Sequence, residues 1–224
     1  MRYALGLFLL LGTLMQVGRA QVVIERPARV QGPEEVVRQG AAFSLIFSNN
    51  GFGIGGSYLR TLGRDWVGFL SLELGAGKDE KEFQFVVDYF GNTIIPGKLN
   101  RLLLLPLQVG VQHRLFRDEL VDSFRPYVLV SLGPTFGWVS PYWNPSTGRP
   151  YDPIGGLPHG RAIGGATLQF GLGANFGTNF RSLQGVGLLY AVSWLPTGVE
   201  LMMESPRQRV FASPQLVLYF GRMW

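Results

Sequence analysis

Residues able to carry out acid–base or metal chemistry are few in this chain. Its 224 residues contain two histidines, His113 and His159, and no cysteine. Zinc sites are built mainly from several His and Cys ligands, and thiol catalysis needs a cysteine. A histidine metal cluster and a thiol enzyme are therefore excluded, and nothing in the carboxylate spacing indicates a metal site. We predict no cofactor and no metal.

A Ser–His site is the enzymatic alternative that the sequence leaves open. A serine nucleophile needs a histidine within hydrogen-bond reach and a third group that orients the histidine. Residues 141–160, rich in proline, glycine and aromatic residues, contain Ser146, Asp152 and His159. Neither histidine has a serine two residues away on the same strand face, and His113 is expected at a membrane interface. We predict that the protein is not an enzyme.

A glycine-rich motif with the spacing G-x-G-x-x-G begins at Gly51 and ends at Gly56. In a dinucleotide site this motif opens a helix, whose N-terminus meets the pyrophosphate. Here the motif continues into Ser57-Tyr58-Leu59-Arg60 and a charged turn without helical periodicity. The glycines are therefore predicted to face a narrow interior rather than a nucleotide.

The first residues of the chain are typical of an export signal. A short basic start precedes an apolar stretch at residues 4–15, and small residues precede an expected cut before Gln21. We predict a signal peptide at residues 1–20, a periplasmic N-terminal segment at 21–40 and a barrel domain at 41–224. Removing Arg2 and Arg19 leaves 18 of the 20 basic residues against 15 acidic ones, a charge near +3. No basic cluster marks a nucleic-acid partner.

Alternation with a period of two dominates the rest of the chain. Between Leu103 and Val111, leucine and valine occupy one face while Pro106, Gln108 and Gly110 occupy the other. The pattern recurs about eight times, over lengths near the roughly 9–11 residues of a tilted membrane strand. We predict an all-β fold: a closed antiparallel up-and-down transmembrane β-barrel of about eight strands, with bulky residues facing lipid.

The other face of each predicted strand carries small and polar residues, which suit the narrow interior of such a barrel. Glu73 and Arg114 could form an ion pair there, or lie apart at a wet rim. The polar residues expected to line the interior are Ser71, Glu73, Gln108, Gln112, Arg114, Thr167, Gln169 and Asn175.

Aromatic residues near the strand ends are expected to form belts at the two membrane interfaces. The members of these belts are Tyr58, Trp66, Trp138, Trp194 and Trp224. Connections are expected to alternate between short turns (60–65, 117–124, 177–184) and external connections, of which one is a tight Asn-Asn-Gly hairpin (49–51) and three are long (77–100, 141–160, 197–209). Strand-like residues 83–90 are expected to extend a hairpin beyond the membrane, not to form a ninth spanning strand.

Taken together, these features resemble the small outer-membrane β-barrel proteins of Gram-negative-type bacteria, the OmpA/OmpX/OmpW-like group. The resemblance implies an outer-membrane location, contact with outer-membrane lipid, and recognition by the barrel-assembly machinery through the last strand, residues 216–224. Arg222 departs from the hydrophobic residue common near the end of that strand.

The expected role is structural or surface binding through the external loops. The alternatives are a narrow channel or transporter for small apolar molecules, a lipid-modifying enzyme and a soluble lipocalin-like barrel. Neither a surface ligand nor a transported solute is identified by the sequence.

Overall fold

The computed structural model describes residues 38–86, 93–117, 119–120, 123–152, 154–177 and 181–224. The expected signal peptide and nearly all of the expected N-terminal segment lie outside these residues. The barrel strands are β1 (Gln39–Ser48), β2 (Gly51–Thr61), β3 (Trp66–Gly77), β6 (Asn100–Arg114), β7 (Phe124–Pro141), β8 (Arg161–Phe176), β9 (Ser182–Val199) and β10 (Gln208–Met223).

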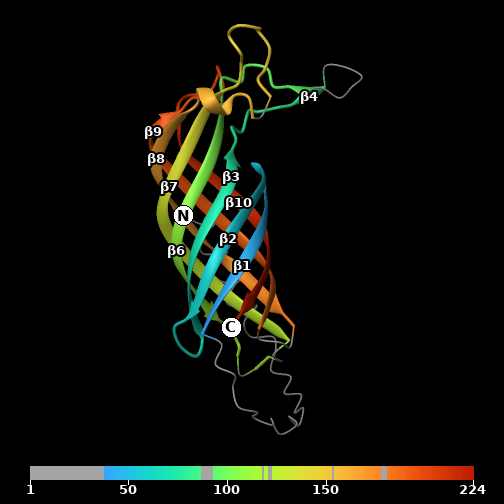
Figure 1. Cartoon of the computed structure of the whole chain (residues 1–224), viewed down its shortest axis with the longest axis vertical. Helices are drawn as coiled ribbons and strands as arrows, with labels where there is room; N and C mark the ends of the chain where they lie inside the picture. The colour runs from blue at the N-terminus through green and yellow to red at the C-terminus, as the bar shows by residue number, and fades with distance from the viewer. Residues whose placement is uncertain (1–37, 87–92, 118, 121–122, 153, 178–180) are drawn as a thin grey trace, which may run out of the picture. The chain divides into compact units, whose positions relative to one another are not determined.

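These strands form one closed antiparallel barrel in the order β1-β10-β9-β8-β7-β6-β3-β2 (Figure 1). Closure comes from pairing of the first strand with the last, from Gly40 opposite Met223 to Ser48 opposite Gln215. The predicted fold class and strand number are confirmed. No helix among the described residues is long and apolar enough to cross a membrane.

Strands β4 (Phe85–Val86) and β5 (Thr93–Ile94) form a separate two-stranded sheet outside the barrel. The prediction that this segment adds no ninth barrel strand is thus confirmed for the residues that the structure describes. Residues 87–92 lie outside that description.

Bulky side chains face outward along every barrel strand, as the alternation predicts. In β6, Val109 is 66% exposed whereas the adjacent Gln108 is fully buried. A continuous ring of outward residues runs around the barrel, in which each residue pairs with the next one on the neighbouring strand. Its members are Ala41, Tyr58, Leu70, Val109, Leu132, Leu168, Val192 and Ala212.

The strands are strongly staggered around the barrel. Ala41 pairs directly with Arg222 on β10, but the ring of paired residues returns to β10 at Ala212, ten residues away. A stagger of this size in an eight-stranded barrel tilts the strands and leaves an interior about wide enough for side chains to fill. Strands that are not neighbours can therefore bring their inward side chains together across the bore.

The barrel wall is not equally tall on all sides. Strands β1 to β3 have 10–12 residues, whereas β7 to β10 have 16–18. The expected length of 9–11 residues is therefore wrong for the second half of the chain. The reason is that β7 to β10 continue to pair with one another above the level at which β1 and β2 turn at Asn49 and Asn50.

The connections divide between the two ends as predicted. At the terminal end, where β1 begins and β10 ends, the Trp224 carbonyl accepts hydrogen bonds from the backbone N–H groups of Arg38 and Gln39. The turns at this end are short (62–65, 115–123, 177–181). The opposite end, here called the loop end, carries the hairpin at 49–50, in which Gly51 has a φ of 121°, and the longer connections 78–99, 142–160 and 200–207.

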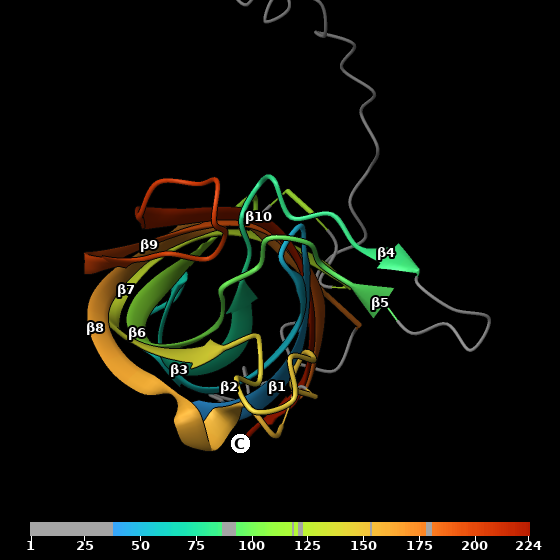
Figure 2. The same ribbon diagram turned by 90° about the horizontal axis from the view of Figure 1, so that it is seen from above.

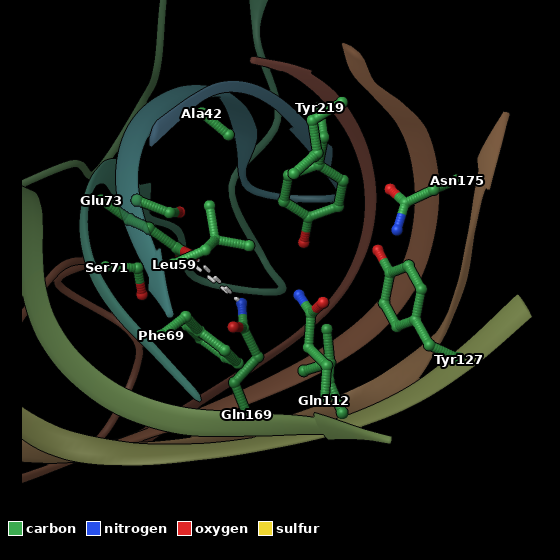
Figure 3. A pocket seen from close by; sticks show the side chains of 13 residues that line it. Ala42, Leu59, Phe69, Ser71, Glu73, Gln112, Tyr127, Gln169, Asn175 and Tyr219 are labelled. Atoms are coloured by element: carbon green, nitrogen blue, oxygen red, sulfur yellow. Dashed lines mark hydrogen bonds between the residues drawn. The ribbon is translucent and has the colours of Figure 1, made fainter. Parts of the chain in front are cut away.

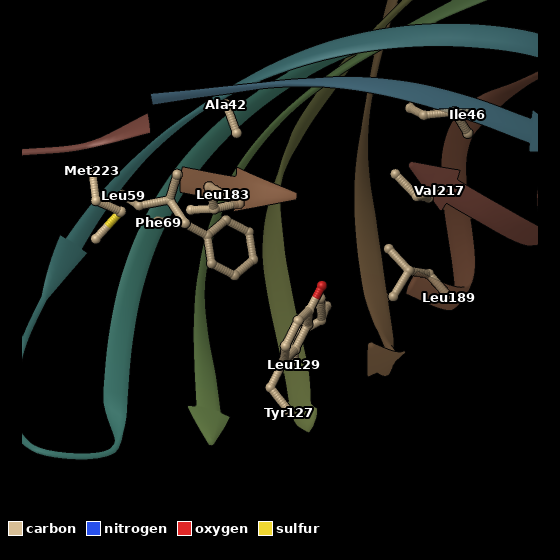
Figure 4. Packing of buried hydrophobic residues seen from close by; sticks show 10 residues of the cluster. All are labelled: Ala42, Ile46, Leu59, Phe69, Tyr127, Leu129, Leu183, Leu189, Val217 and Met223. Atoms are coloured by element: carbon tan, nitrogen blue, oxygen red, sulfur yellow. The ribbon is translucent and has the colours of Figure 1, made fainter. Parts of the chain in front are cut away.

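Two apolar clusters fill much of the interior, so the bore is less uniformly polar than the sequence analysis expected. The terminal cluster includes Leu59, Phe69, Leu183 and Met223 near the terminal end (Figure 4). The loop cluster joins inward residues of β6, β7, β9 and β10 to a connecting loop, and its members are Leu102, Leu104, Val139, Leu195, Val199, Leu201, Met202 and Phe211.

Gly133 marks a place where the backbones of β6 and β7 leave no room for a side chain. A Cβ atom there would lie 1.9 Å from the Leu107 carbonyl oxygen, whereas a Cβ at Gly164 would meet nothing within 4 Å. We expect Gly133→Ala to lower the free energy of unfolding by about 1–3 kcal/mol through overpacking. Urea unfolding measures this loss, with Gly164→Ala as the control. If Gly133→Ala loses no more stability than Gly164→Ala, the expectation is wrong.

Candidate functional site

A belt of hydrogen-bonded polar side chains crosses the middle of the interior. Ser131 on β7 donates to Gln108 Oε1 on β6 at 3.1 Å, and Gln169 Nε2 on β8 donates to Gln215 Oε1 on β10 at 2.9 Å. The Thr167 hydroxyl lies 2.6 Å from that of Ser193 on β9 and also bonds to Thr135. The belt thus links five strands from inside.

Glu73 on β3 is the acidic member of this belt. Gln169 Nε2 lies 3.5 Å from each of its carboxylate oxygens, which makes two long hydrogen bonds from the opposite wall. Leu72 pairs with Leu107, so Glu73 lies beside the middle of β6, whereas Arg114 lies at its terminal end opposite Tyr127. The ion pair considered between Glu73 and Arg114 is therefore not formed.

The structure gathers most of the predicted interior residues around this belt. Ser71, Gln108, Thr167 and Gln169 are buried. Glu73, Gln112 and Asn175 are half-buried and line a cavity toward the terminal end (Figure 3). Arg114 is half-buried but stands apart from them.

Two cavities meet at Glu73. The terminal-side cavity contains Ser71, Gln112 and Asn175 as well as the inward tyrosines Tyr127 and Tyr219. The loop-side cavity is lined by polar residues of several strands, including Thr167 on β8, Ser193 on β9, and Ser213 and Gln215 on β10. Glu73 borders both cavities.

Sequence reasoning missed several members of this region. Ser131, Thr135, Ser193 and Gln215 carry the same inward parity as the residues that were selected, and that parity could have identified them. Tyr127 and Tyr219 were not selected because only small and polar residues were expected to line the interior; the structure buries Tyr127 to 4% exposure.

Some polar atoms of the belt have no protein partner. The hydroxyl of Ser71 and the Nε2 group of Gln108 are both buried and form no hydrogen bond with any described residue. A buried polar group without a partner costs about 1–3 kcal/mol. The interior therefore retains unused hydrogen-bonding capacity beside Glu73.

The aromatic residues that were predicted to form belts at the membrane interfaces lie at the two ends of the barrel. Tyr58, Trp66 and Trp224 lie toward the terminal end, and Trp138 and Trp194 toward the loop end. All five are 39–54% exposed.

The polar atoms and rings of these aromatic residues also contact other side chains and the backbone. The Tyr58 hydroxyl donates to Gln39 Oε1, and Trp138 Nε1 donates to the Leu157 carbonyl. The Trp66 ring lies 4.4 Å from that of His113, which places His113 on the outer face near the terminal end.

A loop cap, defined as residues 95–99 and 200–203, covers the loop end. The Leu99 N–H donates to the Leu201 carbonyl at 2.8 Å, and the Met203 N–H donates to the Gly97 carbonyl at 2.7 Å. Leu201 and Met202 pack into the loop cluster below. Figure 2, which looks onto this end, shows the connection that leads into β6 passing over the bore.

Charged residues hold the cap in place. Lys98 and Glu82 form an ion pair whose side chains are only 10% and 8% exposed. Burial lowers the pKa of Lys98, and the hydrogen bond and charge of Glu82 act in the opposite direction. Below it, the Arg101 guanidinium donates to the carbonyls of Tyr151 and Asp152 and lies 4.9 Å from the centre of the Tyr142 ring.

The loop residues considered for a Ser–His site have other neighbours. His159 stacks on Tyr151 at 5.3 Å, and Asp152 Oδ1 accepts a hydrogen bond from the Gly155 N–H at 2.5 Å. No hydrogen bond joins His159, Asp152 and Ser146 in the part of the loop that the structure describes. Among described residues, no group of three or more His, Asp or Glu residues could hold a metal ion.

Fold and site together define a closed eight-stranded antiparallel β-barrel with an apolar outer surface, a capped loop end and a polar chamber at mid-height. No family model matches the chain, and no curated protein matches it. The closed eight-stranded architecture is the one that the sequence resemblance implies.

Solved structures of such barrels are similar to this chain over most of their length. Neisserial surface protein A has 10% identity and a TM-score of 0.47, with 83% of this chain and 94% of that chain covered. Ail of Yersinia pestis, in complex with the heparin analogue sucrose octasulfate, has 14% identity and a TM-score of 0.41, with 82% and 94% covered. The N-terminal β-barrel domain of Pseudomonas aeruginosa OprF has 11% identity and a TM-score of 0.39, with 82% and 96% covered.

Proposed function

We propose that this protein resides in a bacterial outer membrane as a β-barrel with a structural or surface-binding role carried by its external loops, and that it is not an enzyme. The observation that carries the proposal is the outer surface. Along the middle of the described strands, no outward position bears a charge. The outward basic residues lie near the strand ends, Arg60 and Arg222 at the terminal end and Arg101 at the loop end.

Such a surface suits lipid and not water. Contiguous apolar patches on soluble monomers rarely exceed a few hundred Å². A band of exposed side chains such as Leu70, Val109, Leu132, Phe170 and Leu188 encircles this barrel. A closed barrel leaves no unpaired sheet edge where it spans hydrocarbon, which is the requirement for crossing a bilayer with strands.

Extraction and refolding test the location. We expect the protein to leave the membrane fraction only with detergent, to insert into lipid vesicles, and to migrate differently on gels when boiled and unboiled. A barrel recovered in the aqueous phase without detergent would support the soluble lipocalin-like alternative instead.

The interior argues against an open axial channel. The terminal cluster fills one end of the bore, and the loop cluster with its cap fills the other. We expect no steady ionic current when the full chain is inserted in a planar lipid bilayer, with insertion verified separately by flotation of vesicles. A stable ohmic conductance would favour the alternative of a narrow channel.

The last strand is proposed to be the segment that the barrel-assembly machinery recognises. The support is its position: β10 closes the barrel against β1, and the Trp224 backbone bonds to Arg38 and Gln39. We expect Trp224→Ala to reduce the amount of assembled barrel in cells more than Trp194→Ala, an aromatic change at the other end. Heat-modifiable protein in the outer-membrane fraction measures this difference, and equal yields would contradict the proposal.

A further inference from the structure

The barrel wall has a gap above the hairpin that joins β1 to β2. Backbone pairing of β10 with β1 ends at Gln215 opposite Ser48, although β10 continues to Gln208. Beyond Gln215, the Ser213 hydroxyl donates a hydrogen bond to Asn49 Oδ1 of the hairpin at 2.7 Å. Pairing of β2 with β3 ends at Ile54 opposite Leu74, although β3 continues to Gly77 with only β6 beside it. We call this gap the side notch; its borders are residues 48–53, 75–77 and 208–214.

The loop-side cavity connects the interior with the outer face through the side notch. Its lining includes inward Thr167 and Ser193 together with Phe52 and Leu74, which point outward and are 57% and 41% exposed. Gly75 and Ala76 form one edge of the passage, where the wall carries almost no side chains. Because the loop cap covers the axial mouth of the barrel, a ligand would enter the loop-side cavity through the side notch.

The side notch lies at the level of the loop-end aromatic belt, beside apolar outward side chains. The hairpin below it presents Phe47 and Phe52 outward, with ring centres 5.5 Å apart. On β10, outward Val210 is 55% exposed beside the notch and pairs with the belt residue Trp194. A molecule that enters here would therefore arrive from the bilayer with an apolar part.

At the inner end of the passage, a carboxylate has no cationic partner. Among described residues, the side-chain partner of Glu73 is Gln169, through two long hydrogen bonds. The Ser71 hydroxyl, 3% exposed and without a protein partner, borders the terminal-side cavity, which Glu73 also lines. A protonated primary amine has three N–H donors and no acceptor, which matches carboxylate, hydroxyl and amide oxygens.

We propose that the side notch and the chamber at Glu73 form a binding site for a cationic amphiphile with a primary amine head and an alkyl tail. The ammonium group is held by Glu73, with Ser71 and the amide oxygens of Gln169 and Gln215 as further acceptors. The tail leaves through the notch between Gly75 and the edge of β10 and lies against lipid. This inference rests on the proposed membrane location.

Binding of dodecylamine tests the site, with dodecanol and dodecanoate as probes of equal tail length. We expect the full chain in detergent to bind one dodecylamine at least about tenfold more tightly than either probe, as charge-assisted bonding to a carboxylate implies. Native mass spectrometry counts the bound molecules. Equal binding of dodecanol would overturn the proposal.

Two pairs of variants separate the carboxylate from the passage. Glu73→Gln should reduce dodecylamine binding by about tenfold or more, whereas Glu80→Gln on the exposed loop should not. Gly75→Leu should block the passage, whereas Gly56→Leu on the lipid face should not. A Cβ at either glycine meets nothing within 4 Å, so the backbone at both positions has room for the start of a side chain.

Each variant is first shown to be heat-modifiable and inserted in vesicles. A chain that does not insert counts against the membrane location. An inserted Glu73→Gln or Gly75→Leu barrel that binds dodecylamine as well as the unchanged protein overturns the site itself.

Discussion

Replacing Leu132 with arginine should lower the free energy of unfolding in lipid by about 2–4 kcal/mol. Leu132 belongs to the outward ring, lies midway along β7 and is 60% exposed. The physical reason is depth, because a guanidinium at the bilayer midplane loses its hydration and finds no partner on the lipid face. Urea unfolding of the barrel in lipid vesicles measures the change.

Phe124→Arg is the matched control. Phe124 is also outward and 41% exposed, but it is the first residue of β7 and lies at the terminal end. Arginine near an interface costs only about 0–1 kcal/mol in such barrels. If the two variants lose equal stability, the outer surface does not face a bilayer, and the proposed location fails.

Glu82→Gln should open the loop cap. The change leaves the Lys98 ammonium buried without its carboxylate, and breaking a buried pair in this way costs about 3–5 kcal/mol. Since the cap is a local unit at the end of the barrel, the loss should appear as local opening and not as global unfolding. Amide hydrogen exchange of residues 95–99 and 200–203 should accelerate by orders of magnitude.

The control for this variant is Glu80→Gln, two residues away and exposed. It removes the same charge without touching Lys98, so exchange in the cap should stay unchanged. Unaltered protection of the cap in Glu82→Gln would show that backbone bonds, such as Leu99 to Leu201, hold the cap without the ion pair.

The two ends of the barrel differ in how they are closed, and the difference bears on function. The terminal end is filled by side chains of the strands themselves, such as Phe69 and Leu183. The loop end is closed by a connection between strands, through Leu201 and Met202. An end closed by a loop can change with a partner at the surface, whereas an end filled by strand side chains is fixed with the fold.

Much of the fold could be predicted because a strand has a period of two. Alternation in β6 alone assigns Leu107 and Val109 to one face and Gln108 to the other, and no tertiary contact is needed for that assignment. The polar residues of the interior follow from the same parity. Tyr127 shows where this reasoning stops, because parity states the face of a residue but not whether the interior can hold a large aromatic side chain.

Sequence alone indicated about eight strands, the face of most alternating residues and the placement of long and short connections, because these depend on local alternation and turn residues. Tertiary structure decided the rest. Glu73 and Gln169 meet across the bore from β3 and β8, and the side notch exists because β1 to β3 end before β7 to β10 do. Both depend on the stagger between strands, which is set by pairing of residues far apart in the chain and leaves no trace in the alternation of any single strand.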